Sequence, residues 1–151
     1  SRAPVHEGVN NPDNVAGLFR SAAAFGIELV VLGPNSGDPL YRKAIRTSMG
    51  ATLSVPFVEA PQWPGAISDL RRDGFTVVAL TPAMGAAPLE EVFPHAKLAL
   101  LVGSEGTGLT EAALRTATLR IRIPTTANVD SLNVTTAASI AMYHCFAEKR
   151  A

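Results

Sequence analysis

The sequence predicts a single α/β domain with a mainly parallel sheet covered by helices on both faces. Apolar runs at 27–32, 75–80 and 97–102 are nearly continuous, as in strands buried on both faces. Helical segments separate these runs, which is the order of parallel βαβ units. A length of 151 residues fits one domain, and 47% hydrophobic against 17% charged residues indicates a globular chain.

Strands and helices alternate along the whole chain. Asn11 and Pro12 suit a helix start, and Gly26 suits the end of that helix. Pro124 closes the last strand, and Ser131 suits the N-cap of a final helix. The expected strands lie at 4–6, 27–32, 53–58, 75–80, 97–102 and 118–123. The expected helices are one that ends at 25 and others at 41–49, 65–73, 110–116 and 132–149, with a single turn at 89–93.

Composition excludes several classes of protein. No apolar run reaches the roughly 18 residues of a membrane span, and no targeting pattern is seen, so we expect no membrane contact and a cytoplasmic location. The histidines lack ligand spacing, so we expect no metal. The lone Cys145 reads as a small apolar helix residue rather than a nucleophile.

Charge is balanced overall, with 13 basic and 13 acidic residues, which argues against a general nucleic-acid sleeve. A balanced total charge does not exclude a local basic face. Two groups of cations are candidates for such a face: Arg42, Lys43 and Arg46, and Arg115, Arg120 and Arg122. Arg71 and Arg72 read as solvated surface charge.

Three segments carry residues suited to chemistry. In the first helix, Asn14, Gly17 and Arg20 follow a slowly winding stripe, and Gly17 indicates that something approaches the backbone closely. Arg20 suits phosphate or carboxylate recognition, or it is a surface arginine lying over the core. Residues 103–108 form a glycine-rich loop between strand and helix, which is either a ligand loop or a tight turn with an exposed Glu105. Ser131 and Asn133 offer polar groups where the last helix begins, and simple capping would also explain Ser131.

Together, these segments resemble the SpoU branch of the SPOUT RNA methyltransferases. Residues 11–20 are similar to the family's first motif, 101–109 to its second, and 123–134, continuing to 143, to its third. The motifs follow in order over nearly the whole chain. The resemblance implies a deep C-terminal trefoil knot, an exception to the usual avoidance of knots. It also implies a homodimer in which the first and last helices bury the faces of 15–24 and 137–141.

The resemblance implies a 2′-O-ribose methyltransferase that uses S-adenosylmethionine and acts on rRNA or tRNA, with rRNA slightly preferred. Six residues match the family's cofactor-binding positions: Leu80, Thr81, Gly103, Ile123, Pro124 and Leu132. Five match its catalytic or substrate-positioning positions: Arg20, Asn14, Glu105, Ser131 and Asn133. Because arginine stays protonated in proteins, we expect Arg20 to hold the target phosphate rather than to act as a base.

The chain departs from the family pattern in two ways. Thr125 and the pair Ala127-Asn128 stand where the family usually has a methionine and a glycine. Many relatives also carry an N-terminal RNA-binding domain, so we expect residues 1–151 to be the catalytic domain of a longer protein. Two other classes stay open: a non-catalytic RNA-binding or assembly protein that retains the fold, and a nucleotide-binding α/β enzyme such as a dehydrogenase. The second lacks the G-x-G-x-x-G spacing, and binding of S-adenosylmethionine against NAD would separate the classes.

Overall fold

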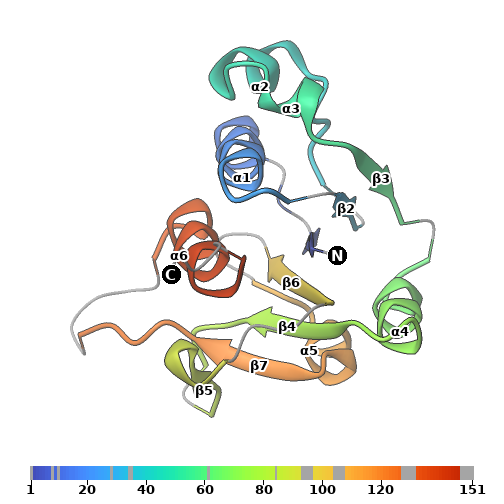
Figure 1. Cartoon of the computed structure of the whole chain (residues 1–151), viewed down its shortest axis with the longest axis vertical. Coiled ribbons are helices and arrows are strands. Elements are labelled where there is room, and N and C mark those ends of the chain that lie inside the picture. The colour runs from blue at the N-terminus through green and yellow to red at the C-terminus, as the bar shows by residue number, and fades with distance from the viewer. Residues whose placement is uncertain are drawn as a thin grey trace.

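The computed structural model describes most of the chain in fourteen helices and strands (Figure 1). The described residues are 2–7, 9, 11–27, 29–33, 36–60, 62–83, 85–92, 97–103, 108–126 and 132–146, with the backbone alone for 2–7 and 32. The strands are β1 (Arg2–Glu7), β2 (Val30–Leu32), β3 (Phe57–Glu59), β4 (Thr76–Leu80), β5 (Ala87–Pro88), β6 (Leu98–Gly103) and β7 (Leu119–Arg122). The helices are α1 (Pro12–Ala24), α2 (Arg42–Thr47), α3 (Ala51–Ser54), α4 (Gly65–Arg72), the 3-10 turn η1 (Leu89–Glu91), α5 (Glu111–Thr116) and α6 (Val134–Phe146).

The strands form one seven-stranded sheet in the order β3-β2-β1-β6-β4-β7-β5, and all neighbouring pairs are parallel. The predicted fold class is therefore confirmed. β6 lies at the centre, and all six of its residues are buried, which explains its continuous apolar run. The knot stays a prediction, because the connections before α5 and α6 include residues outside those described.

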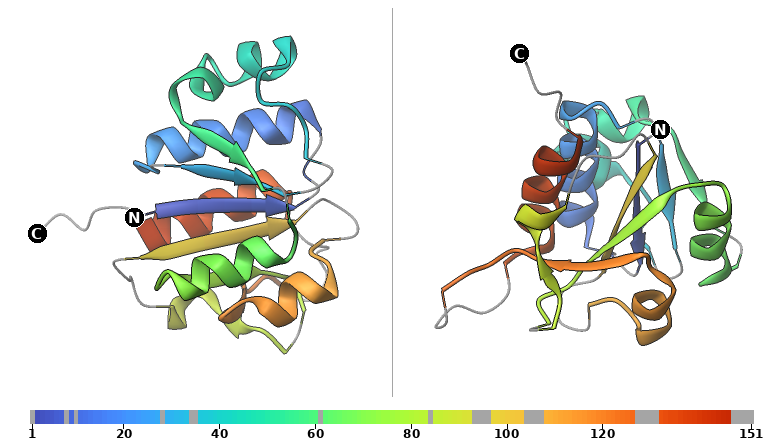
Figure 2. Two further views of the ribbon diagram at one scale, coloured as in Figure 1. Left: turned by 90° about the vertical axis from the view of Figure 1, so that its right-hand side faces the viewer. Right: turned by 60° about the horizontal axis from the view of Figure 1, so that its bottom comes forward.

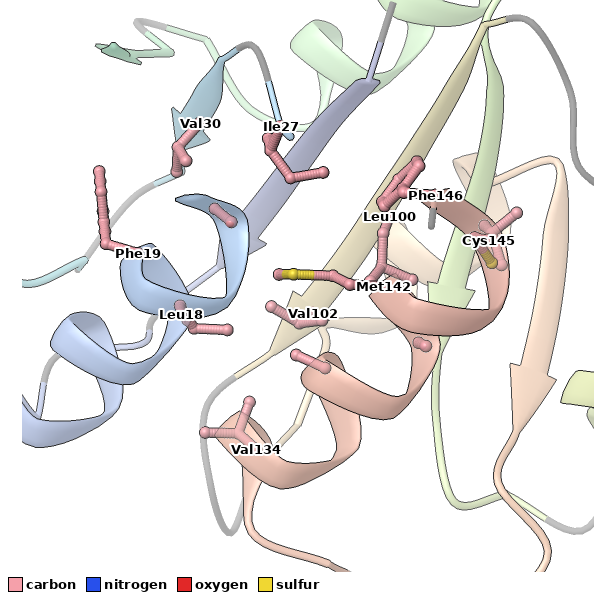
Figure 3. Close-up of a cluster of buried hydrophobic side chains, with 14 of the residues drawn as sticks. Leu18, Phe19, Ile27, Val30, Leu100, Val102, Val134, Met142, Cys145 and Phe146 are labelled. Carbon is pink, nitrogen blue, oxygen red and sulfur yellow. The ribbon is translucent and has the colours of Figure 1, made fainter. Parts of the chain in front are cut away.

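Side chains of β6 alternate between two hydrophobic cores, one on each face of the sheet. Leu98, Leu100 and Val102 point to the core shared with α1 and α6, where Leu18 and Met142 also lie (Figure 3). Ala99 and Leu101 point to the core shared with α4 and α5. In the left view of Figure 2, α4 and α5 lie in front of the sheet and α6 lies behind it.

Helix α1 has the ends that its sequence predicts. The Asn11 side chain accepts a hydrogen bond from the backbone N–H of Asp13 at 2.8 Å, and Pro12 occupies the first turn. Gly26 has φ +68°, and the N–H of Ile27 donates to the carbonyl of Ala22 at 2.9 Å. This is the left-handed end that favours glycine.

The sequence placed three elements incorrectly. The segment predicted as a strand at 53–58 begins with helix α3, and β3 starts only at Phe57. Ala51 and Thr52 are buried in that helix, which packs against α1, so tertiary packing outweighs strand propensity here. Strand β5, only two residues long, is not among the predicted strands. The last helix starts at Val134 rather than at 132. Among the described residues, no helix is long and apolar enough to cross a membrane.

Candidate active site

The candidate site begins where the central strands end. Because β6, β4 and β7 are parallel neighbours, their C-terminal ends meet at one edge of the sheet. Leu80 lies in register with Ile121, and the N–H of Thr81 donates to the carbonyl of Ile121 at 2.9 Å. Five of the predicted cofactor positions, Leu80, Thr81, Gly103, Ile123 and Pro124, therefore follow or end strands at this edge.

Gly103, the last residue of β6, is in close contact with the chain that returns after the following loop. A Cβ added at this position would lie 2.5 Å from the carbonyl carbon of Gly108 and 2.8 Å from its oxygen, and it would also meet the backbone nitrogen of Leu109. Backbone atoms cannot move aside as a flexible side chain can, so only glycine fits here. Glu105 lies between Gly103 and Gly108 in the sequence, outside the described residues.

The segment that follows β4 is hydrogen-bonded to β7. The N–H of Ala83 donates to the Thr81 hydroxyl oxygen at 3.3 Å, and the N–H of Ala86 donates to the carbonyl of Ala83 at 3.1 Å. The guanidinium of Arg122 donates through Nε to the carbonyl of Ala86 at 3.2 Å. The sequence places Arg122 in a candidate basic face with Arg115 and Arg120, and it does not predict this contact because the partner is a backbone carbonyl 36 residues away.

The first and third motif segments meet where α1 and α6 begin. Asn133 Nδ2 donates to Asn14 Oδ1 at 3.3 Å. The Thr135 hydroxyl lies 3.3 Å from both the carbonyl oxygen and Oδ1 of Asn14. Asn14 is 9% exposed, so these bonds satisfy a nearly buried amide. Sequence reasoning singled out Asn14 and Asn133 but not Thr135.

Asn133 is also the cap of α6. Its Oδ1 accepts from the N–H groups of Thr135 at 2.8 Å and Thr136 at 3.3 Å. The sequence predicts this role for Ser131, but the helix starts two residues later than expected. Ser131 itself lies outside the described residues, and Leu132 is half-buried before the cap.

Gly17 allows the two helices to approach. A Cβ added to Gly17 would collide with Cγ2 of Thr135 and would lie 3.0 Å from its hydroxyl oxygen. One turn further along, the hydroxyls of Ser21 and Ser139 are 2.6 Å apart. The prediction that something approaches the Gly17 backbone is confirmed, and Thr135 is what approaches it.

Arg20 is exposed, unlike Asn14. At 100° per residue, the stripe of Asn14, Gly17 and Arg20 winds from the α6 contact out to solvent. Arg20 stands about 9 Å further along the helix axis than Asn14. Among the described residues, no ion pair or hydrogen bond involves the Arg20 guanidinium.

Only part of the α1–α6 surface is exposed and could contact a second copy of the chain. Val15, Leu18, Ala22, Ala138 and Ala141, all within the faces expected to pack across a dimer, are buried inside the chain itself. The residues left exposed beside them include Ala23, Ala24, Ile140 (40%) and Tyr143 (67%). The Tyr143 ring contacts Phe25 edge-on, with centroids 6.0 Å apart.

Other reactive side chains play structural parts. Burial raises the pKa of the Cys145 thiol to about 11, so the thiol stays protonated, and its interpretation as a packing residue is confirmed. His144 Nε2 lies 2.9 Å from the carbonyl oxygen of Val92. Within the described part of the chain, no three His, Cys, Asp or Glu side chains cluster as metal ligands would.

Comparison with known proteins shows that the chain is similar to RNA methyltransferases. Residues 4–143 match the model of the SpoU rRNA Methylase family. A tRNA/rRNA methyltransferase of Mycobacterium tuberculosis is 47% identical over 142 residues, which are 92% of this chain and 49% of that protein. A 23S rRNA guanosine 2′-O-methyltransferase of Bacillus subtilis is 33% identical, over 91% of this chain and 55% of that protein.

A solved structure has the same fold. The AdoMet-bound rRNA methyltransferase from Sinorhizobium meliloti superimposes with a TM-score of 0.88 at 28% identity, over 95% of this chain and 55% of that one. This chain thus spans about half the length of the relatives it matches.

Proposed function

Because the chain belongs to the SpoU rRNA Methylase family, we propose that residues 1–151 form the catalytic domain of an RNA 2′-O-ribose methyltransferase that uses S-adenosylmethionine. The observation that carries the proposal is the contact of Asn14 and Gly17 with Asn133 and Thr135. It joins two motif segments about 120 residues apart, beside the edge where the strands of the second and third motifs end. The B. subtilis relative is named for 2′-O-methylation of 23S rRNA, which favours rRNA as the substrate. A cytoplasmic location is part of the proposal, because a bacterial rRNA substrate is found there.

The edge of the sheet fits the cofactor. Gly103 has no room for a side chain, because the backbone of Gly108 and Leu109 packs against it, so only its backbone groups would contact a ligand at this strand end. Leu80 and Ile123 pack their side chains against the core, which leaves their backbone groups at the edge. Gly103, Ile123 and Leu132 would hold the cofactor through backbone groups, with Leu80, Thr81 and Pro124 beside them. The bound cofactor supplies an electrophilic methyl group.

The residues of the chain would position and activate the ribose hydroxyl. Methyl transfer needs that oxygen in line with the methyl group, and the hydroxyl must lose its proton. In this proposal Arg20 holds the neighbouring phosphate and stabilises the developing oxyanion electrostatically. The proton passes to phosphate, water or Glu105. Asn14 and Asn133 act as positioning residues, because their amides hold α1 against the start of α6.

A homodimer would complete the site. Arg20 faces solvent two turns into α1, away from the strand ends of its own chain, so a second copy could bring an Arg20 to the cofactor edge. The exposed Ile140 and Tyr143 beside Ala23 and Ala24 are the surface proposed for that contact. Sedimentation velocity at micromolar concentration tests this arrangement: a stable monomer would remove it, and Tyr143→Arg should turn a dimer into a monomer.

Calorimetric titration with S-adenosylhomocysteine, the product form of the cofactor, tests the function. We expect one site per chain, and NAD should not bind. A folded chain that binds no S-adenosylhomocysteine would overturn the cofactor assignment and favour the non-catalytic RNA-binding alternative. Transfer of labelled methyl groups to purified rRNA and tRNA would then identify the substrate.

A further inference from the structure

The surface of α2 and α3 combines cations with exposed apolar side chains. Leu40, Tyr41, Met49 and Leu53 are 51%, 59%, 79% and 65% exposed. Arg42, Lys43 and Arg46 are exposed among them. Residues 39–58 contain these three cations and no acidic residue, although the chain as a whole has 13 of each sign. We call this surface, residues 40–53, the α2–α3 face.

The cations on this face do little for the helix that carries them. Arg42 and Arg46 are four residues apart, so they share one side of α2, with the buried Ala44 on the other. Like charges at this spacing repel, and Arg42 in the first turn opposes the helix dipole, whereas Arg46 in the last turn interacts favourably with it. Among the described residues, neither arginine has a hydrogen bond or ion pair. Their arrangement suits an external anion better than it suits the fold.

Met49 also stands at an unfavourable position. It has φ +57°, in the left-handed region where glycine is preferred, and its side chain projects into solvent. It ends α2: its N–H donates to the carbonyl of Arg46 at 3.2 Å, and the N–H of Gly50 donates to the carbonyl of Ile45 at 2.9 Å. A glycine would close this turn at lower cost. Strained, exposed apolar residues of this kind are typical of binding surfaces.

The α2–α3 face adjoins the helix that carries Arg20. In Figure 1, α1 lies between α6 and the α2–α3 pair, and α2 and α3 both contact α1. Lys43 Nζ lies 3.9 Å from a carboxylate oxygen of Asp13 in the first turn of α1. Asp13 and Arg20 are seven residues apart and therefore lie on the same side of α1. An RNA strand that reaches Arg20 can thus continue onto α2.

We propose that the α2–α3 face binds single-stranded RNA next to the nucleotide held at Arg20, with Arg42 and Arg46 on phosphates and a base stacked on Tyr41. Aromatic side chains beside cations recognise unpaired bases in this way, and stacking tolerates any base. Among the described residues, only Lys43 of the three cations has a carboxylate partner, Asp13, so the positive charge of Arg42 and Arg46 favours a polyanion over a protein partner. The inference rests on the proposed RNA substrate and assigns the flanking contact.

The test is fluorescence anisotropy of a labelled single-stranded 12-nucleotide oligouridylate with the 151-residue chain. The double variant Arg42→Gln/Arg46→Gln should bind about tenfold more weakly, and its log–log salt slope should fall by about 1.4. The matched control, Arg71→Gln/Arg72→Gln, removes as many charges from α4 on the other face of the sheet and should change affinity less than twofold. Equal loss in the two double variants, or no RNA binding by the parent chain, would overturn the inference.

The aromatic contact has its own control. Tyr41→Ala should lower RNA affinity about tenfold, whereas Tyr41→Phe, which keeps the ring, should bind like the parent. If Tyr41→Ala changes self-association in sedimentation but leaves RNA affinity unchanged, the face is a protein interface and the inference is wrong. Titration of every variant with S-adenosylhomocysteine tests whether the variant is folded and binds the cofactor, independently of RNA binding. If the proposed cofactor assignment is wrong, the titration with S-adenosylhomocysteine will show it and the anisotropy measurement will not.

Discussion

The helices on the two faces of the sheet are held in different ways. On one face, α1 and α6 bury apolar side chains such as Leu18 and Met142 against the sheet. These two helices also meet each other through polar contacts, from the Asn14, Asn133 and Thr135 group to the paired hydroxyls of Ser21 and Ser139. On the other, α4 and α5 bury apolar side chains such as Ile67 and Ala113 against the sheet. Directional bonds fix how two helices sit relative to one another, whereas apolar burial mainly supplies stability. The face that carries the motif residues is therefore the one built for orientation.

The substitution with the largest expected effect on this comparison is Arg20→Ala on α1. It should lower the rate of methyl transfer at least about 100-fold, because one preorganised charge at a developing oxyanion has effects of this size. The affinity for S-adenosylhomocysteine should stay within about twofold of the parent if Arg20 acts only on RNA. Arg72→Gln on α4 is the matched control and should leave the rate unchanged. Loss of cofactor binding together with turnover would show that Arg20 supports the pocket or the fold instead.

On the opposite face, Ile67→Ala should mainly affect stability. Ile67 is fully buried at 0% exposure, and its truncation leaves a cavity beneath α4. We expect the free energy of unfolding in urea to fall by about 3 kcal/mol. The affinity of the remaining folded protein for S-adenosylhomocysteine should not change. A weaker affinity would show that the two faces are coupled through the sheet.

Gly17→Ala tests the close approach of α1 and α6. Alanine is normally favoured over glycine in a helix by about 1 kcal/mol. Here the added Cβ meets the Thr135 side chain, so the free energy of unfolding should instead fall by about 1–2 kcal/mol. In the double variant Gly17→Ala/Thr135→Ala the clash is absent, and the cycle should give a coupling energy of about 1 kcal/mol. An increase in stability for Gly17→Ala alone would contradict the contact.

Gly65→Ala on α4 should have the smallest effect. The added Cβ would be 3.8 Å from Cβ of Gln62, an ordinary contact, and the position needs no left-handed backbone. We expect the free energy of unfolding to change by less than about 0.5 kcal/mol or to rise slightly. Thermal unfolding of Gly17→Ala and Gly65→Ala, measured together, compares the effect of the same substitution on the stability of the two faces. Equal losses at both positions would remove the distinction between them.

Local patterns in the sequence were enough to predict much of the fold. The alternation of strand and helix, the cap at Asn11 and the left-handed end at Gly26 depend on residues within a few positions of one another. The parallel sheet also followed from local patterns, because continuous apolar strands separated by helices have few other arrangements. The motif segments were recognisable because each is a short run of adjacent residues.

The sequence by itself thus determined the fold class, most element positions and the residues worth testing. Only the tertiary structure decided that Asn133 caps α6, that Thr135 fills the space left by Gly17, and that residues 51–54 are helical. These outcomes depend on partners brought together by the order of the strands. Such partners leave no periodic signal, since a hydrogen bond across 119 residues has no repeat along the chain.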